Sequence, residues 1–516
     1  MDTLPQDIID HIVSYLFARK FKPRKPYSYL HHHLSRAQLA TVSRRLQTAV
    51  ERWTFRDIRI NSDELEKFIQ LLTPARRTFL AGLEFIPILP SYKEAAGTRA
   101  ESPAERAAND ESYTQAMQSL LETLKTWEEE DPHSVNYLLK LSINLPKSPS
   151  DRAWQGVFPQ WGSILPKGFC IYEGRYLHSY IDLLRLEQLP EVNRVKHLVM
   201  KRPDKKRMYR NFCPKVPFML ASKMPNLESV NFSMDDTEER FHDLRAHNRQ
   251  EAADSLRRLS LPRLKSARLD FWHRRYRHEG AAPPRLHRVG MPDPLSAAIC
   301  DFSMNLVDLE LSGIFDASLL RPLNSVVWPE LQILRIKLEP VTPSGEWYFL
   351  ESHPSNDPMV NRPSSEITHK NLHEESFSFR RESAYAGQSI VCTSIFRGRV
   401  NEKALAPVIE AYADALSSMP KLRKAKLICN LDLKDETLSE PLSFQIAYFA
   451  PGEYSKSGRV DVNYNNCQLV TSLLGWVPSP DLMAKLRGIQ DEYRVEPMKV
   501  MDVGDSFEKK MEALQI

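Results

Sequence analysis

Two clusters of polar residues carry side chains that could bind a metal. His31–His33 form a histidine triplet, and imidazole nitrogens are common zinc ligands. Metal sites usually gather ligands from separate elements, with carboxylates or thiolates among them, so we interpret the triplet as part of a solvated loop. The acidic residues of Asp235–Glu239 could hold a hard cation, but such a run more often marks a solvated strand exit. The sequence therefore predicts no metal site.

Thiol and hydrolase chemistry also lacks a recognisable pattern. The chain contains no G-x-S-x-G, no phosphate-binding loop, no G-x-G-x-x-G and no H-E-x-x-H. Six cysteines are scattered without a CxxC pair or a zinc-ligand spacing: Cys170, Cys213, Cys300, Cys392, Cys429 and Cys467. We interpret them as reduced intracellular thiols. We expect no catalytic residue and no cofactor, and so a protein that is not an enzyme.

Two basic runs could contact an acidic partner or nucleic acid. They lie at residues 200–212 and 273–278, and each directly follows a predicted strand. If those strands are parallel, both runs emerge at the same edge of the sheet. The alternative is a pair of exposed loops without a partner. The basic residues are Lys201, Arg202, Lys205, Lys206, Arg207 and Arg210 in the first run, and Arg274 and Arg275 in the second.

Composition limits the remaining function classes. The chain has 516 residues, 42% of them hydrophobic and 26% charged, as is typical of globular proteins. At about 150 residues per domain this suggests about three domains, unless the chain is a repeat array. A net charge of +4 argues against general nucleic-acid binding. We expect no membrane span and no signal peptide, and hence a cytoplasmic or nuclear protein.

The first element of the chain is an unusually apolar helix. In "LPQDIIDHIVSYL" (residues 4–16), half of the helical circumference is apolar: Leu4, Ile8, Ile9, Ile12, Val13 and Leu16. Thr3 can serve as the N-cap, and Pro5 lies in the first turn. One neighbouring helix does not usually cover so wide a surface. The helix therefore packs on two elements of its own chain, or one side of it is kept for a partner.

A basic loop, a second helix and a short strand follow. Residues 17–35 contain two prolines and predict a loop. Apolar residues at three- and four-residue intervals predict a helix over residues 35–53, and alternation predicts a strand over 54–60.

A weak repeat of the form L-x-x-φ-x-φ, where φ is apolar, determines the expected architecture. Four copies follow a proline by two residues, and each copy reads as a short strand that must stack on its neighbours. The alternative is an α/β domain whose parallel strands merely share an apolar pattern. Seven copies begin with Leu, at residues 80–85, 138–143, 227–232, 264–269, 306–311, 331–336 and 422–427, and an eighth begins with Val at 195–200.

Helices and interruptions lie between these strands. Periodicity predicts helices over residues 62–72, 115–127 and 405–419. Loops are expected at residues 91–112, 273–294 and 352–371. Near the C-terminus, residues 442–464 predict two strands around a turn, and a helix is expected near 479–493.

The expected fold class is therefore α/β with three parts. Residues 1–60 form a small helical domain, and residues 61–436 form an irregular leucine-rich-repeat-like array of short parallel strands and helices. Residues 437–516 form an α+β region that closes the array, since exposed terminal repeats need covering.

The chain resembles fungal F-box proteins with degenerate leucine-rich repeats. The resemblance lies in "LPQDIIDHIVSYL" for the first F-box helix and in "LATVSRRLQTAVERWTFRDIRI" (39–60) for the second helix and the exit strand. Residues 396–427 resemble a C-terminal region of the same proteins. Two features depart from the family: the loop after Leu16 is long and basic, and Leu46 stands where the family often has Trp.

The resemblance implies a substrate receptor of a cullin-based ubiquitin ligase. The F-box helices would dock on a Skp-type adaptor and thereby on the cullin scaffold, while the repeats hold a protein target that the sequence does not identify. The adaptor-facing residues implied in this way are Leu4, Pro5, Ile8, Ile9, Ile12, Leu16, Leu39, Val42 and Leu46. Two other classes stay open: a repeat-based scaffold whose first helix only caps the array, and a nucleic-acid-binding protein that uses the basic runs.

Overall fold

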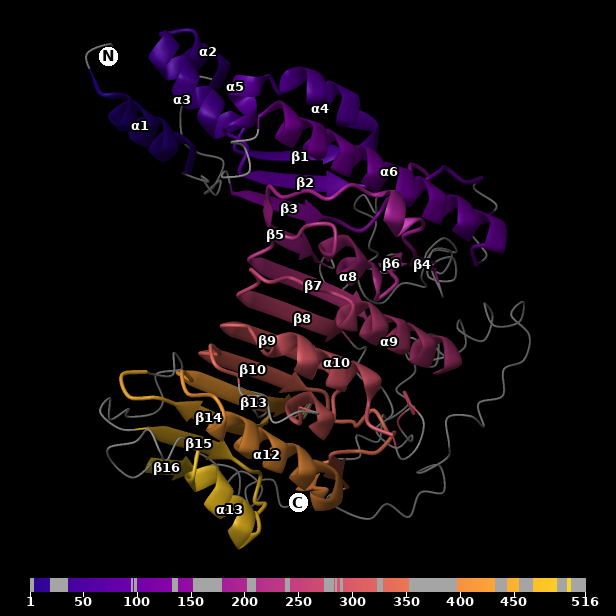
Figure 1. Cartoon of the computed structure of the whole chain (residues 1–516), viewed down its shortest axis with the longest axis vertical. Coiled ribbons are helices and arrows are strands. Elements are labelled where there is room, and N and C mark those ends of the chain that lie inside the picture. Colours follow the sequence, from indigo (N-terminus) through magenta and orange to yellow (C-terminus); the bar gives the residue numbers. More distant parts are fainter. Residues whose placement is uncertain are drawn as a thin grey trace, which may run out of the picture.

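One long sheet organises the molecule, and Figure 1 shows it running from the N-terminal to the C-terminal end. The computed structural model describes residues 4–18, 36–93, 96, 100–131, 138–151, 179–201, 210–236, 242–272, 283, 285–287, 291–322, 328–351, 397–431, 443–453, 467–489 and 499–502. Within them, a 12-stranded sheet has the order β1-β2-β3-β5-β7-β8-β9-β10-β13-β14-β15-β16.

The strands follow the chain order across this sheet. All neighbours from β1 to β13 are parallel, β14 is antiparallel to both β13 and β15, and β15 and β16 are parallel again. Their bounds are β1 (Asp57–Asn61), β2 (Gly82–Ile86), β3 (Leu139–Ile143), β5 (Val195–Met200), β7 (Ser229–Asp235), β8 (Ser266–Trp272), β9 (Asp308–Gly313), β10 (Ile333–Leu338), β13 (Lys424–Asn430), β14 (Ser443–Phe449), β15 (Gln468–Ser472) and β16 (Lys499–Asp502). Two further small sheets within the described part of the chain pair β4 (Tyr180–Ile181) with β6 (Asn211–Phe212), and β11 (Phe349–Leu350) with β12 (Arg399–Val400).

Helices follow one another along one side of the sheet, as α6, α8, α9, α10 and α12 do in Figure 1. The helices are α1 (Gln6–Ala18), α2 (Arg36–Ala40), α3 (Arg44–Thr54), α4 (Leu65–Leu71), α5 (Pro74–Arg77), α6 (Pro103–Glu130), α8 (Val216–Ala221), α9 (His242–Arg257), α10 (Pro294–Ser303), α12 (Glu402–Ser417) and α13 (Pro480–Arg487). Short 3₁₀ turns lie at η1 (Ser62–Glu64), η4 (Leu186–Gln188) and η5 (Ala317–Leu320). The predicted α/β class with a large, mostly parallel sheet is confirmed.

The two φ positions of the repeat form two continuous rows of buried side chains across the sheet. Their register is unbroken: Leu309, for example, pairs with Ala267 on one side and with Leu334 on the other. The first row contains Leu83, Leu141, Leu198, Val230, Ala267, Leu309, Leu334 and Ala425, and the second contains Phe85, Ile143, Met200, Phe232, Leu269, Leu311, Ile336 and Leu427. The prediction of parallel strands at all eight motifs is confirmed.

In five of the eight motifs, the anchoring leucine closes a tight turn before its strand. Its backbone N–H donates to the carbonyl oxygen three residues earlier at 3.1 Å in Leu227, Leu264 and Leu306, and all three side chains are buried. Leu138 was expected to play the same part but is 57% exposed. The register shifts at this point, so the buried Leu139 pairs with Val195 and takes the anchor position.

Several predicted boundaries are wrong for local reasons. The helix expected over residues 35–53 is interrupted, because the Ser43 side chain accepts a hydrogen bond from Leu46 N–H and caps a new helix, α3. The loop expected over residues 91–112 ends early, because Ser102 and Glu105 form a capping box that starts α6 at Pro103.

The remaining loop and C-terminal predictions are tested only in part. Helix α13 confirms the C-terminal helix, and β14 confirms the first of the two strands expected within 442–464. Residues 454–466, 273–282 and 352–396 lie outside the described residues. The sheet is continuous across both expected domain boundaries, since β1 pairs with β2 and β13 pairs with β14.

If the anchors stabilise the array, Leu331→Ala should destabilise the protein by about 2–5 kcal/mol, because Leu331 is fully buried. The matched control is Leu138→Ala, which should change stability by less than about 0.5 kcal/mol at its exposed site. Urea denaturation of the full chain measures both. Equal losses in the two variants would contradict this view of the anchors.

Candidate functional site

The N-terminal helices form a small hydrophobic cluster of their own. Helix α1 lies against α3, and Ile9, Val13, Leu46, Ala49 and Val50 are buried between them. This cluster is separate from the large core between the sheet and its helices. Figure 1 places α1, α2 and α3 together at the N-terminal end of the molecule.

Polar contacts fix the position of α1 on α3. Asp10 of α1 forms an ion pair with Arg52 of α3. Arg45 Nη1 donates to the carbonyl oxygen of Leu4 at 2.7 Å, and Gln6 Nε2 donates to that of Arg45 at 3.1 Å. The start of α1 is thereby held to the first turn of α3.

A second set of contacts fixes α3 to the next helix. Arg76 of α5 donates to Glu51 at 2.9 Å, and its guanidinium lies 4.7 Å from the centre of the Phe55 ring. The hydrogen bond from Arg76 lowers the pKa of Glu51. The helical cluster is therefore attached to the start of the sheet by packing, an ion pair and a cation–π contact.

The side of α1 that faces away from α3 is apolar and exposed. Ile8 is 44% exposed, Ile12 38%, Tyr15 57% and Leu16 54%. These four residues, here called the α1 stripe, recur at three- and four-residue intervals and so share one helical face. Val42, in the turn between α2 and α3, is 62% exposed. Grouped exposed apolar side chains indicate an interaction site.

The nine implied adaptor-facing residues separate into two groups. Ile9 and Leu46 are buried between α1 and α3, while Leu4 and Leu39 are half-buried against the same cluster. Ile9 and Leu46 therefore contact each other's helix and are withdrawn from any partner surface. The residues left on the outside are Pro5, Ile8, Ile12, Leu16 and Val42.

Sequence reasoning missed Tyr15. At 100° per residue, Tyr15 falls between Leu4 and Ile8 on the helical circumference, so the period alone could have identified it.

The predicted basic edge remains a prediction. Lys201 is exposed at the end of β5, but Arg202, Lys205, Lys206, Arg207, Arg274 and Arg275 lie outside the described residues. Arg210, counted in the same run, is buried and bonds to Glu101 and Asp151 at 2.8 Å each. Arg210 therefore belongs to an internal ion pair and does not face solvent.

The prediction that Asp235 and Asp236 are solvated is wrong. Both are buried at the end of β7, whereas the sequence predicted a solvated strand exit. Arg245 donates to Asp236 at 2.6 Å, and Arg249 Nη1 approaches it at 3.5 Å. Glu238 and Glu239 lie outside the described residues, and within the described chain no cluster of His, Cys, Asp or Glu could hold a metal.

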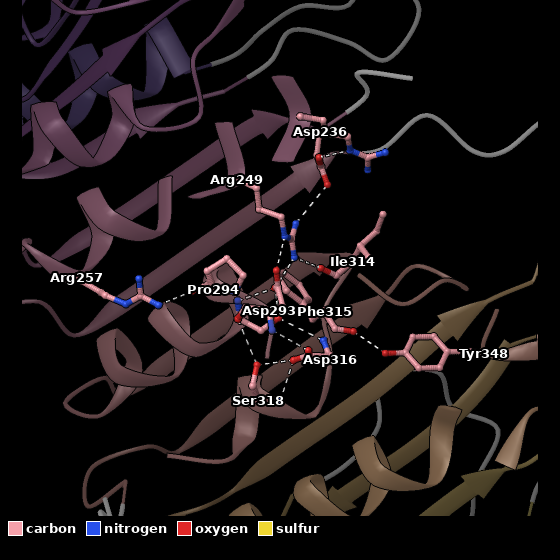
Figure 2. Close-up of polar contacts among 12 residues, drawn as sticks. Asp236, Arg249, Arg257, Asp293, Pro294, Ile314, Phe315, Asp316, Ser318 and Tyr348 are labelled. Carbon is pink, nitrogen blue, oxygen red and sulfur yellow. Dashed lines mark hydrogen bonds and ion pairs between the residues drawn. The ribbon is translucent and has the colours of Figure 1, made fainter. Parts of the chain in front are cut away.

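Arg249 is the centre of the buried cluster in Figure 2. Its Nε and Nη2 atoms donate to the two carboxylate oxygens of Asp293 at 2.7 Å each. Asp293 also caps α10 by accepting from the Ser296 N–H at 2.8 Å and from its hydroxyl at 2.6 Å. Burial alone would raise the pKa of Asp293, but Arg249 and Ser296 outweigh it and hold the pKa below its ordinary value.

The same cluster reaches the loop after β9. The Asp293 N–H donates to Asp316 at 3.0 Å, and the Tyr348 hydroxyl donates to the carbonyl oxygen of Phe315 at 2.6 Å. Both Asp293 oxygens are thus occupied by donors from the protein itself. This arrangement joins α9, α10 and the sheet, and it is suited to structure rather than to proton transfer.

The carboxyl of Asp110 has a pKa raised well above its ordinary value. Burial, and then the charges of Asp182 and Glu101, raise its pKa to about 6. Such a shift can mark a catalytic acid. Here, however, Asp110 accepts the Asp182 N–H at 2.9 Å, while Ser179 and Arg210 both donate to Glu101. We therefore assign this cluster to the packing of α6 against the loop around residue 182.

The described cysteines are free and buried, at positions 213, 300, 429 and 467. Burial raises the pKa of Cys213 and of Cys300 to about 12. Thiols of this kind stay protonated and unreactive.

No protein-family model, curated protein or solved structure matches this chain. Among the described helices, none is both long enough and apolar enough to cross a membrane. The α1 stripe is thus the strongest candidate site on the physical evidence of the chain itself.

Removing Arg249 tests the structural assignment of the buried cluster. Arg249→Met should cost about 3–5 kcal/mol, because it leaves the buried carboxylate of Asp293 without its cation. Arg257→Met is the matched control on the same helix; this half-exposed arginine should contribute less than about 1 kcal/mol. Guanidinium denaturation at pH 7 measures both.

The effect of Arg249→Met should also depend on pH. The pKa of Asp293 in the folded protein lies below its ordinary value of 3.8. The ionised carboxylate of Asp293 therefore stabilises the fold above pH 4, and this contribution to the free energy of unfolding is lost as the pH falls further. A difference between wild type and variant that did not shrink on acidification would contradict this assignment.

Proposed function

We propose that this protein is a non-catalytic substrate receptor of a cullin-based ubiquitin ligase. In this proposal α1 docks on a Skp-type adaptor, and the sheet domain holds a target protein. The observation that carries the proposal is the α1 stripe, an exposed apolar face on a helix whose other face is already packed on α3.

The size of the stripe supports an interface that extends beyond α1. Ile8, Ile12 and Leu16 are about half exposed, so burying the rest of the three side chains yields roughly 2–5 kcal/mol in total. Association costs of about 4–15 kcal/mol offset this gain. A stable complex therefore needs further contacts, and the exposed Val42 in the turn between α2 and α3 offers one.

The resemblance to F-box proteins gives independent support. It covers α1 and the α2–α3 segment, which are the elements that pack together at the N-terminal end. The family departure at Leu46 concerns a residue that lies under α1, so the missing aromatic ring alters the internal packing of the cluster.

The separate hydrophobic cluster allows the N-terminal helices and the sheet domain to bind different partners. Adaptor binding would use α1 and the α2–α3 turn, and target binding would use the sheet domain, without competition for the same side chains. A ligase receptor of this kind would act in the cytoplasm or the nucleus.

The scaffold alternative predicts a different exposure of the apolar residues of α1. A helix that only caps the array would bury its apolar residues against the chain, whereas four large side chains of α1 are exposed. We therefore favour the docking proposal.

The test substitutes two neighbouring residues of α1 by Asp, one in each of two variants. Ile12→Asp places a carboxylate in the α1 stripe and should weaken retention of a purified Skp-type adaptor at least tenfold. His11→Asp places the same group on an adjacent exposed position outside the stripe and should leave retention unchanged. Co-purification of adaptor and cullin with the full chain measures both, with circular dichroism as the check on folding.

Two results would refute the proposal. One is a folded wild-type chain that retains no adaptor at all, in which case α1 is a cap. The other is an equal loss in both variants, which would place the contact elsewhere on the chain.

A further inference from the structure

The face of the sheet opposite the helices carries polar side chains in a regular register. Strand residues alternate, so that those between the buried rows point to this second face. One row across it includes Arg268, Glu310, Arg335 and Lys426 on the successive strands β8, β9, β10 and β13. We call this surface the polar face of the sheet.

Charge is distributed unevenly over the polar face. The charged residues on β9 are acidic, namely Asp308 and Glu310. All the charged residues on the polar face of β10 and β13 are basic: Arg335, Lys337, Lys424 and Lys426. Two neighbouring strands thus form a cationic area beside an acidic strand.

Two of the four basic residues are neutralised by the chain. Arg335 bonds to Asp308 at 3.3 Å, and Lys424 bonds to Glu453 at 2.5 Å. Lys337 and Lys426 form no ion pair or hydrogen bond with the residues that the structure describes. Both are half-buried, and burial lowers the pKa of Lys426. A partly desolvated ammonium group without a counter-ion favours the approach of an anion.

We infer that Lys337 and Lys426 bind carboxylate side chains of an extended acidic segment of the target protein. This inference rests on the proposed function, because it names the kind of target that the receptor holds.

The geometry favours an extended segment. Lys337 lies opposite Ile428 in the register, and Lys426 lies two residues before Ile428, so the two lysines are diagonal neighbours. From the strand spacing, their Cα atoms are roughly 8 Å apart, close to the spacing of alternate residues in an extended peptide. The half-buried Ile333 and Ile428 lie on the same two strands. An acidic segment with interleaved apolar residues therefore fits this area.

The probe is a fluorescein-labelled ten-residue peptide of alternating Glu and Val, titrated with the full chain and followed by fluorescence anisotropy. Lys337→Glu with Lys426→Glu should weaken binding at least tenfold. The control, Lys67→Glu with Lys140→Glu, makes the same change in net charge at two exposed sites and should stay within twofold of wild type. Lys337→Met with Lys426→Met removes the charges with little change in side-chain length, and keeps the test valid if the glutamates disturb folding.

Three results would overturn the inference: a wild-type chain that does not bind the peptide, equal losses in the two Glu variants, or full binding by the Met variant. Adaptor retention separates this inference from the proposed function. The Lys337 and Lys426 variants should still retain the adaptor, and Ile12→Asp should still bind the peptide. A chain that binds the peptide but no adaptor would refute the ligase role alone.

Discussion

A short parallel strand with one apolar face cannot bury that face alone, and here each strand buries it by aligning with its neighbours. The alignment puts Leu269, Leu311 and Ile336 side by side on successive strands, so every strand depends on the register of the next. Tight turns at five of the anchoring leucines, Leu80, Leu227, Leu264, Leu306 and Leu422, lie directly before their strands. The same alignment places the polar residues between the apolar ones in rows on the opposite face.

The ends of such an array must be covered, and this chain covers them differently. At the C-terminal side, β14 runs antiparallel to both of its neighbours, and β15 and β16 extend the sheet to its described edge. At the N-terminal side, α1 and α3 form a separate cluster beside β1. Because the cluster buries only one side of α1, the other side stays exposed. The α1 stripe therefore follows from how the N-terminal end is built.

Local periodicity was sufficient to predict the eight parallel strands and the helices α1 and α12, because alternation and helical spacing lie in adjacent residues. It could not predict which side of α1 packs on α3, so Ile9 and Ile12 looked equivalent although one is buried and the other exposed. Asp236 and Arg210 looked like solvent-exposed charges. Asp236 is buried against arginines of the following helix α9, and Arg210 pairs with Glu101, which precedes α6 and is 109 residues away. Such pairings depend on the tertiary fold and leave no local signal.

We propose that the exposed face of α1 binds the adaptor, and hydrogen–deuterium exchange of the full chain, with and without a saturating purified Skp-type adaptor, can locate the contact. We expect slower exchange in residues 6–18 and 36–54 when the adaptor is bound, and unchanged exchange in β10 and β13. Unchanged exchange in α1 and α3, or protection confined to the sheet, would contradict this proposal.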